Sequence, residues 1–220
     1  MSAATGEIVS VNVGRPRQVE WHGRTVTTAI WKNPVPGRVL VEGVNLAGDD
    51  QADRRVHGGE TKAVYAYAAE DYAWWAEQLG EALRPGTFGE NLTLAGVDLR
   101  ALVVGERWRA GTAVLRVTEP RFPCFKLGIR MGDAAFVDRF GAARRSGSYF
   151  AIERAGMVGA GDAMERLETP DERYTIGDFV DDHEDGGPEA LERLAGQPLV
   201  SQAWREHAER AAARARAKAP

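Results

Sequence analysis

Short segments in which apolar and polar residues alternate constrain the fold of this chain more than any other feature. Between Ile8 and Val13, valines alternate with Ser10 and Asn12, and residues 113–118 repeat the same two-residue period. That period is typical of a β-strand with one face turned to a core and the other to solvent. We expect the three valines of the first segment to share one face of the strand, with Ser10 and Asn12 on the other.

Further strand-like segments are separated by turns rich in Gly and Pro. We expect strands at residues 24–31, 38–41, 63–67, 107–109, 148–153 and 161–167. One clear helix interrupts them at residues 70–79, with Gly80 as its stop, and a shorter helix is expected at residues 134–140. Many short strands with few helices predict a mainly β fold of the barrel type.

The composition changes near residue 169, where a polar linker begins. Beyond it, Thr175 with Asp178 resembles a capping box, and Pro188 suits the first turn of a second helix. A third helix, rich in Ala and Arg, completes a small helical appendage. We therefore expect two domains: a β-barrel domain over residues 1–168 and a three-helix domain over residues 169–220.

Charge and composition exclude several classes of protein. The 220 residues carry a net charge of −4 and are 44% hydrophobic, which is ordinary for a globular protein and argues against a stable nucleic-acid partner. No apolar run is long enough to span a membrane, and the first residues lack the pattern of a signal peptide. We expect a cytoplasmic protein, since a lone thiol survives there.

The only cysteine, Cys124, lies in an unusual setting. Pro120 and Pro123 restrict the backbone that leads to it, and Arg121 and Lys126 flank it with positive charge that favours the thiolate. A single thiol cannot form an intramolecular disulfide, so a chemical role is nucleophilic, redox or metal-binding. The alternative is a buried cysteine that acts as a small hydrophobic residue.

A second segment, residues 53–62, joins His57 to the glycine pair Gly58 and Gly59 and ends at Lys62. Paired glycines let the backbone approach a ligand closely, and their N–H groups can cradle an anion. Lys62 is a natural partner for a phosphate. The competing interpretation is an ordinary glycine turn before a strand, with His57 exposed.

A third segment, residues 88–92, carries Glu90 and Asn91 beside Gly89. A carboxylate and an amide on a glycine-supported turn suit the polar edge of a heterocycle or an ordered water. A turn of this kind is also common in ordinary loops, so this segment by itself is only a weak indication of a binding site.

Together, His57-Gly58-Gly59 with Lys62, then Phe88-Gly89-Glu90-Asn91-Leu92, then Pro120 to Leu127 closely resemble the MOSC domain family. The order and spacing are similar to those of its stand-alone bacterial members of the YiiM type. The resemblance covers about residues 6–168, and the helical tail resembles that subgroup more loosely. It implies a MOSC-type (PK-like) β-barrel with a few helices, followed by the small three-helix domain.

The resemblance also implies a molybdenum cofactor, a molybdopterin, held in the barrel. Cys124 would be the metal ligand, and a soft thiolate is chemically suited to molybdenum. Carried over by motif, the cofactor-binding positions are His57, Gly58, Gly59, Lys62, Glu90, Asn91, Arg121 and Lys126.

The implied activity is that of an oxidoreductase, the reduction of small N-hydroxylated compounds such as hydroxylaminopurines to amines. His57 is a candidate proton donor, with a structural or cofactor-contact role as the alternative. One cysteine cannot build an iron–sulfur cluster, so a flavoprotein reductase is expected as electron donor. Two other functions stay open, a non-redox carrier of sulfur or cofactor through Cys124 and a Cys124/His57 thiol hydrolase; a homodimer is also open.

Overall fold

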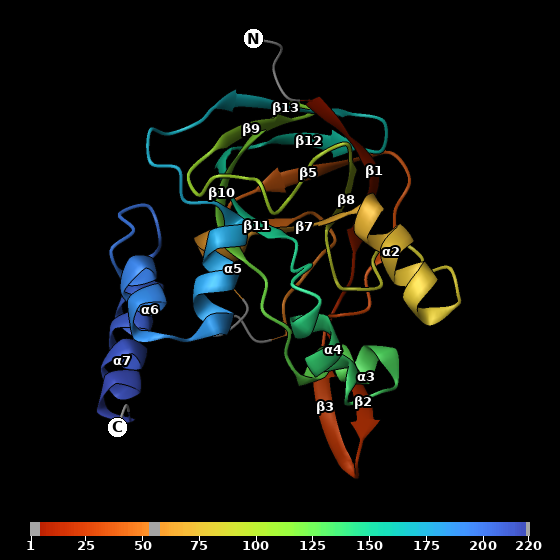
Figure 1. The fold of residues 1–220 in the computed structure, drawn as a ribbon. Coiled ribbons are helices and arrows are strands. Elements are labelled where there is room, and N and C mark those ends of the chain that lie inside the picture. The colour runs from red at the N-terminus through yellow and green to blue at the C-terminus, as the bar shows by residue number, and fades with distance from the viewer. Residues whose placement is uncertain (1–4, 53–57, 219–220) are drawn as a thin grey trace.

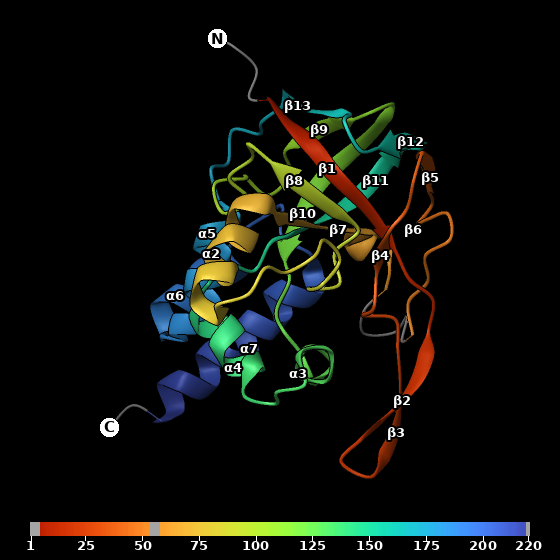
Figure 2. The same cartoon turned by 90° about the vertical axis from the view of Figure 1, so that its right-hand side faces the viewer.

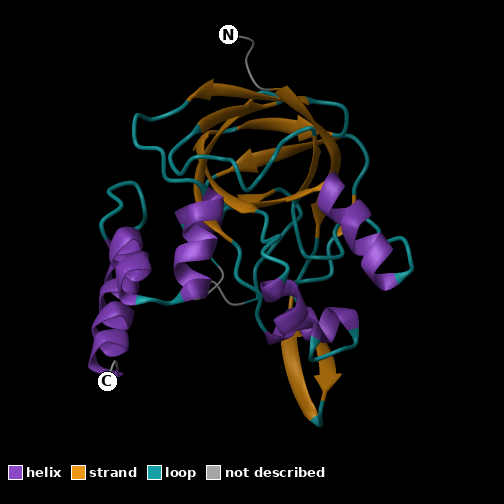
Figure 3. Ribbon diagram, in the orientation of Figure 1, coloured by secondary structure: helices purple, strands orange, loops and turns teal. Residues whose placement is uncertain are grey.

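A computed structural model describes residues 5–52 and 58–218, and its centre is a β-barrel (Figures 1 and 3). Seven strands follow one another in the order β13-β9-β10-β11-β7-β8-β1, and β1 pairs with β13 to close the ring. All neighbours are antiparallel except β7 and β8. The barrel strands are β1 (Thr5–Val13), β7 (Val64–Ala68), β8 (Leu92–Ala95), β9 (Arg107–Ala110), β10 (Ala113–Pro120), β11 (Ser148–Arg154) and β13 (Ala163–Glu168). The predicted mainly β barrel is confirmed.

Smaller sheets flank the barrel. The strands outside the ring are β2 (Arg17–Trp21), β3 (Arg24–Thr28), β4 (Asn33–Pro34), β5 (Arg38–Glu42), β6 (Asn45–Leu46) and β12 (Gly156–Gly159). β4 pairs with β1, and β12, β5 and β6 form a three-stranded sheet. β2 and β3 form a hairpin that projects from the barrel (Figure 2). His22 and Gly23 at its tip both have positive φ, which is the geometry of the turns that hairpins favour.

The alternation in β1 differs from the prediction at one position. Val9 is 43% exposed, whereas Ile8 and Val11 are buried. A β-bulge between Ile8 and Ser10 shifts the pairing of β1 with β8, and the extra residue moves Val9 to the outer face. The prediction that the valines of this strand share one face is therefore wrong at Val9.

Helices near the barrel create a second apolar cluster. α2 (Ala69–Leu79) ends at Gly80 in the left-handed conformation, as predicted, and it buries Tyr72 and Trp75. Those rings pack with Phe88 and with the phenylalanines of α4 (Phe136–Ala142). A further short helix, α3 (Phe125–Met131), was not expected from the sequence.

Three helices follow the barrel: α5 (Ile176–Asp185), α6 (Pro188–Ala195) and α7 (Gln202–Lys218). Thr175 and Asp178 form the predicted capping box, and Pro188 opens α6. β13 ends at Glu168, where the linker was expected, while the division into two domains stays a prediction. None of the helices in residues 5–52 and 58–218 combines the length and apolar character needed to cross a membrane.

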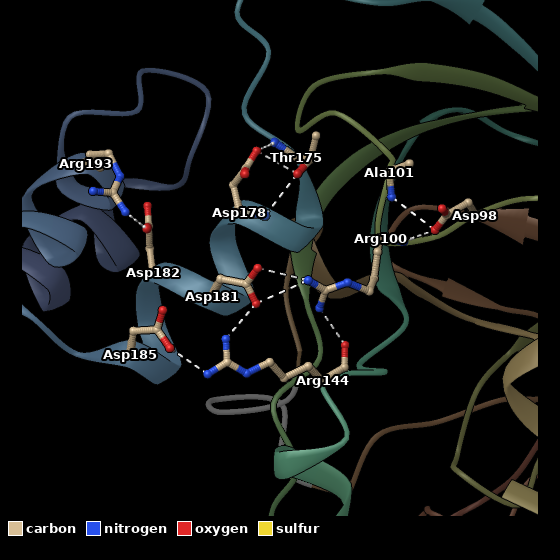
Figure 4. Close-up of polar contacts among 10 residues, drawn as sticks. All are labelled: Asp98, Arg100, Ala101, Arg144, Thr175, Asp178, Asp181, Asp182, Asp185 and Arg193. Carbon is tan, nitrogen blue, oxygen red and sulfur yellow. Dashed lines mark hydrogen bonds and ion pairs between the residues drawn. The ribbon is translucent and has the colours of Figure 1, made fainter. Parts of the chain in front are cut away.

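Polar and apolar contacts fix α5 to the barrel (Figure 4). Asp181 accepts hydrogen bonds from Arg100 and Arg144, at 3.0 Å and 2.9 Å, and Asp185 accepts one from Arg144 at 2.6 Å. Phe179 is fully buried in the same apolar cluster as the barrel core. The helices and the barrel therefore share one continuous core.

Phe179→Ala tests this shared core. Loss of a fully buried ring should lower the free energy of unfolding by about 3–5 kcal/mol. Denaturant unfolding followed by far-UV circular dichroism and by tryptophan fluorescence should give coincident transitions. Leu199→Ala, at a side chain that is 39% exposed, is the control and should change stability by less than about 1 kcal/mol. Two separate transitions in the wild type would contradict a shared core.

Candidate functional site

A cavity of about 90 Å³ opens at one end of the barrel. Its walls come from segments far apart in the sequence, because barrel closure brings their ends together. The lining residues are Thr28, Ala29, Ile30, Lys32, Asp50, Gln51, Ala52, Lys62, Tyr65, Gly89, Asn91, Arg121, Cys124, Lys126 and Tyr149.

Cys124 lies in the wall of this cavity and is partly exposed. It immediately precedes α3 and has extended backbone angles, with φ −127° and ψ 169°. Its carbonyl oxygen accepts a hydrogen bond from the N–H of Leu127 at 2.8 Å, the first turn of the helix. The thiol is therefore presented from the fixed end of a helix rather than from an unsupported loop.

Arg121 is the most heavily buried cation of the cavity wall, with 7% of its surface exposed. Its Nη1 is buried without a hydrogen-bond partner, and its guanidinium lies 5.4 Å from the centre of the Tyr65 ring. It also interacts electrostatically with Cys124. A buried guanidinium that lacks a carboxylate in the described part of the chain is costly, so the wall is prepared for an anion.

Two lysines add positive charge. Lys62 ends the short 3₁₀ helix η1 (Glu60–Lys62), and its Nζ lies 3.4 Å from Oε1 of the buried Glu119. Burial raises the pKa of the Glu119 carboxyl, and the charge of Lys62 opposes that rise. Lys126, in the first turn of α3, lines the cavity on the side of Cys124.

A buried ion pair underlies another wall of the cavity. Lys32 donates a hydrogen bond to Asp49, and only 9% and 1% of the two side chains are exposed. Asp49 also accepts hydrogen bonds from the N–H of Gly14 at 2.7 Å and from the side chain of Asn91 at 2.9 Å. Burial lowers the pKa of the Lys32 ammonium group, and Asp49 opposes that change.

Asn91 uses its amide to join strands rather than to face a ligand. Its side-chain oxygen accepts a hydrogen bond from the N–H of Tyr65 at 3.1 Å, and its own N–H donates to the carbonyl of Tyr65 at 2.7 Å. Its carbonyl accepts from the N–H of Asn12 at 2.7 Å. Asn91 lines the cavity as predicted, but most of its polar capacity is already used.

Glu90 does not line the cavity, contrary to the prediction. Its Oε1 accepts hydrogen bonds from Tyr72, Thr93 and the N–H of Gly86, at 2.7 Å, 2.9 Å and 2.6 Å. The carboxyl is fully buried, and this burial raises its pKa. In β8 and the turn before it, alternation turns Glu90 inward and Asn91 toward the cavity.

Two tyrosines complete the wall. The hydroxyl of Tyr65 donates a hydrogen bond to the carbonyl of Ser146 at 2.8 Å, so its proton is already used within the protein. Tyr149 faces Tyr65 with ring centres 5.1 Å apart. Burial raises the pKa of Tyr149 to about 12, although Arg121 opposes the shift, so its phenol keeps its proton at neutral pH.

Five of the predicted positions meet at this cavity: Lys62, Asn91, Arg121, Cys124 and Lys126.

The other predicted positions do not line the cavity or cannot be placed. Gly58 and Gly59 are described but do not line it. The carbonyl of Gly59 accepts from the N–H of Lys62 at 3.1 Å, and its φ of 100° favours glycine. His57 lies outside the described residues. Within residues 5–52 and 58–218, no group of three or more His, Cys, Asp or Glu side chains is arranged to hold a metal ion.

Sequence reasoning missed Lys32, Gln51, Tyr65 and Tyr149 as site residues. Gln51 and Tyr65 stand close to the motif of His57 and Lys62 and share in the family resemblance, but they were given no role, and nothing in the local sequence marks Lys32 or Tyr149. Tyr149 pairs with Tyr65 across β11 and β7, which are more than eighty residues apart in the chain. The available signal was the predicted strand at residues 148–153, which gives no information about what its inner face meets.

Comparisons with known proteins agree on one family. The MOSC domain matches residues 53–165. An uncharacterized protein, YflK of Bacillus subtilis, is 34% identical over 90% of both chains. A protein of Gibberella moniliformis named "Reductase" is 30% identical over 78% of this chain and 31% of its own length. The crystal structure of YiiM from Geobacillus stearothermophilus superposes with a TM-score of 0.76 at 30% identity, covering 94% of this chain and 99% of that chain.

Lys32→Met tests the buried ion pair. The substitution leaves the Asp49 carboxylate buried without its counter-charge, and we expect the free energy of unfolding to fall by about 3–5 kcal/mol. The double variant Lys32→Met/Asp49→Asn removes both charges and should recover most of that loss. Urea unfolding at pH 7 measures both. A double variant as unstable as the single one would contradict the assignment.

Glu90→Gln tests the buried carboxyl through its pH dependence. The folded-state pKa of Glu90 is raised above the unfolded value, so its stabilising contribution is complete below the unfolded pKa and is lost as pH rises through the folded pKa. The neutral glutamine should therefore be at least as stable as the wild type at pH 8. Its advantage should shrink as the pH falls toward the ordinary carboxyl range.

Unfolding midpoints measured between pH 5 and pH 8 give this comparison. Glu77→Gln, at an exposed position of α2, removes the same charge without a buried site and serves as the control. A Glu90→Gln protein that is less stable than the wild type at pH 8 would show that the ionised form is required.

Proposed function

The chain belongs to the MOSC domain family, and from that premise we propose that it is a molybdenum-cofactor oxidoreductase that reduces N-hydroxylated compounds to amines. The family and a relative named "Reductase" support a redox activity associated with the cofactor. The finer proposal rests on one observation: the only thiol, Cys124, and the guanidinium of Arg121, whose buried Nη1 has no hydrogen-bond partner, line the same cavity.

The residues of the cavity fit an anionic, metal-bearing group. A soft thiolate is a suitable ligand for molybdenum, and Arg121, Lys62 and Lys126 provide positive charge around it. The buried Nη1 of Arg121 still has a hydrogen bond to donate, which is the capacity that a phosphate or another anionic oxygen would use. Cys124 would hold the metal, and the three cations would hold the anionic part of the cofactor.

When bound, the cofactor supplies the two-electron redox chemistry. In the overall reaction, two electrons and two protons convert a hydroxylamine to an amine and water, and the N–O bond is the bond that breaks. The protein must therefore orient the N–OH group, exclude competing water and supply protons.

Tyr149 is suited to act as a proton donor in this reaction. It lines the cavity beside Arg121 and stays protonated at neutral pH because burial raises its pKa to about 12. A neutral phenol can donate a hydrogen bond to the substrate hydroxyl oxygen as that oxygen leaves. His57, the proton donor considered from the sequence, stays a candidate for the delivery of the second proton.

Electrons must reach this site from another protein, since the chain has one cysteine and so cannot hold an iron–sulfur cluster. We therefore include a flavoprotein reductase as partner in the proposal. The competing function is a non-redox carrier of sulfur or cofactor, for which the partly exposed thiol of Cys124 is equally suitable.

Cys124→Ser is the central test. Protein produced in a host that makes molybdopterin should contain molybdenum and should reduce a hydroxylaminopurine with dithionite and methyl viologen. The serine variant should keep its thermal unfolding midpoint and lose at least about 100-fold in kcat, because a hard hydroxyl replaces a soft metal ligand. Metal analysis and single-turnover assays measure the two effects.

Cofactor-loaded wild type that shows no turnover with this reductant would favour the carrier. A Cys124→Ser protein with full activity would remove Cys124 from the chemistry altogether.

A further inference from the structure

Three arginines without carboxylate partners converge beside the cavity. Arg17 lies on β2, Arg84 in the loop after α2, and Arg130 on α3. The guanidinium carbon of Arg17 is 3.8 Å from the centre of the Trp31 ring, and that of Arg130 is 5.9 Å from the same centre. In the described part of the chain none of the three forms an ion pair.

Like charges repel one another within this group. Burial lowers the pKa of Arg130, and the charges of Arg84 and Arg17 add to that change, whereas Tyr72 and Glu90 oppose it. Its Nε is buried without a hydrogen-bond partner. On the barrel, by contrast, Arg107 and Arg116 both pair with Glu153. A chain of net charge −4 thus keeps a local concentration of positive charge in one place.

The cluster adjoins the mouth of the cavity. Arg130 follows Lys126 by one helical turn on α3, and Lys126 lines the cavity. Trp31 lies in the chain between Ile30 and Lys32, which also line it.

Phe125, next to Cys124, is 55% exposed and is the most exposed of the large apolar side chains in the described residues. The elements that carry these residues, α3 and the β2–β3 hairpin, lie at the same end of the molecule (Figures 1 and 2). We call Arg17, Arg84, Phe125, Lys126 and Arg130 the basic face.

We propose that the basic face is the docking surface for an acidic electron-donor protein of the flavodoxin kind. The inference rests on the proposed function, which needs two electrons from outside for each turnover. Reduced flavin mononucleotide supplies these electrons as it is oxidised; two protons enter, the N–O bond breaks, and amine and water leave. Redox partners form small, short-lived interfaces in which charge complementarity steers the encounter. An exposed aromatic residue, Phe125, on the same short helix as Lys126 and Arg130 has the character of such an interface.

The test uses the cofactor-loaded full chain and the variant Arg17→Glu/Arg84→Glu. Both side chains are exposed and neither lines the cavity, so turnover with dithionite and methyl viologen should equal that of the wild type. With reduced flavodoxin as donor, kcat/KM should fall about 10-fold or more at low ionic strength. The difference should shrink as salt is added, because exposed charges are screened. Calorimetric titration with oxidised flavodoxin should show the same loss in affinity without any turnover.

Arg173→Glu/Arg214→Glu is the matched control. It makes the same change of charge at two exposed positions, Arg173 shortly before α5 and Arg214 on α7, and both helices lie away from the hairpin in both views (Figures 1 and 2). Turnover with flavodoxin should stay within about twofold of the wild type, since neither Arg173 nor Arg214 belongs to the basic face.

The outcomes separate this inference from the proposed function. Wild type that is inactive with the chemical reductant contradicts the proposed function. Wild type that is active with the chemical reductant but not with flavodoxin overturns the docking proposal alone. So does an Arg17→Glu/Arg84→Glu variant that matches the control, or a flavodoxin-dependent rate that is insensitive to salt.

Discussion

The hydrogen bonds of Asn91 hold together the part of the barrel on which the cavity depends. Asn91 exchanges hydrogen bonds with Tyr65, accepts one from Asn12 and donates to Asp49. It thereby ties β1, β7, β8 and the loop before η1 at one point. β7 and β8 form the single parallel pair of the ring, and their pairing cannot be secured by a short hairpin turn. The side chain of Asn91 adds hydrogen bonds at the point where β7 and β8 begin to pair. It thereby fixes the position at which these four segments of the cavity wall meet.

Buried charge is the second constraint on this end of the barrel. Lys32 and Lys62 each have a carboxylate partner, whereas Arg121 is surrounded by the rings of Tyr65 and Phe140. Aromatic faces stabilise a guanidinium only partly, and the buried Nη1 of Arg121 keeps an unused hydrogen-bond donor. An anion bound in the cavity would therefore gain most from its contact with Arg121.

Features set by local rules were predictable from the sequence. The strand at residues 113–118, the helix ending at Gly80 and the capping box at Thr175 follow from periodicity and terminal residues, which act within one element. Features set by pairing between distant strands were not predictable from the sequence. The bulge that exposes Val9 and the inward turn of Glu90 depend on which strand lies alongside, and periodicity alone does not carry that information.

In the candidate site, too, local features were predictable from the sequence and features that depend on distant segments were not. The motif around Cys124 was recognisable because its unusual residues are neighbours in the chain, but the helix that follows was not. That helix, α3, has the greater consequence, since Cys124 precedes it, Lys126 lies in its first turn and Arg130 in its last. Seven helical residues span only about 10 Å. Cys124 and three residues of the basic face, Phe125, Lys126 and Arg130, therefore belong to one short helix and the residue before it, and a protein docked against Arg130 would stand at a fixed, short distance from the thiol.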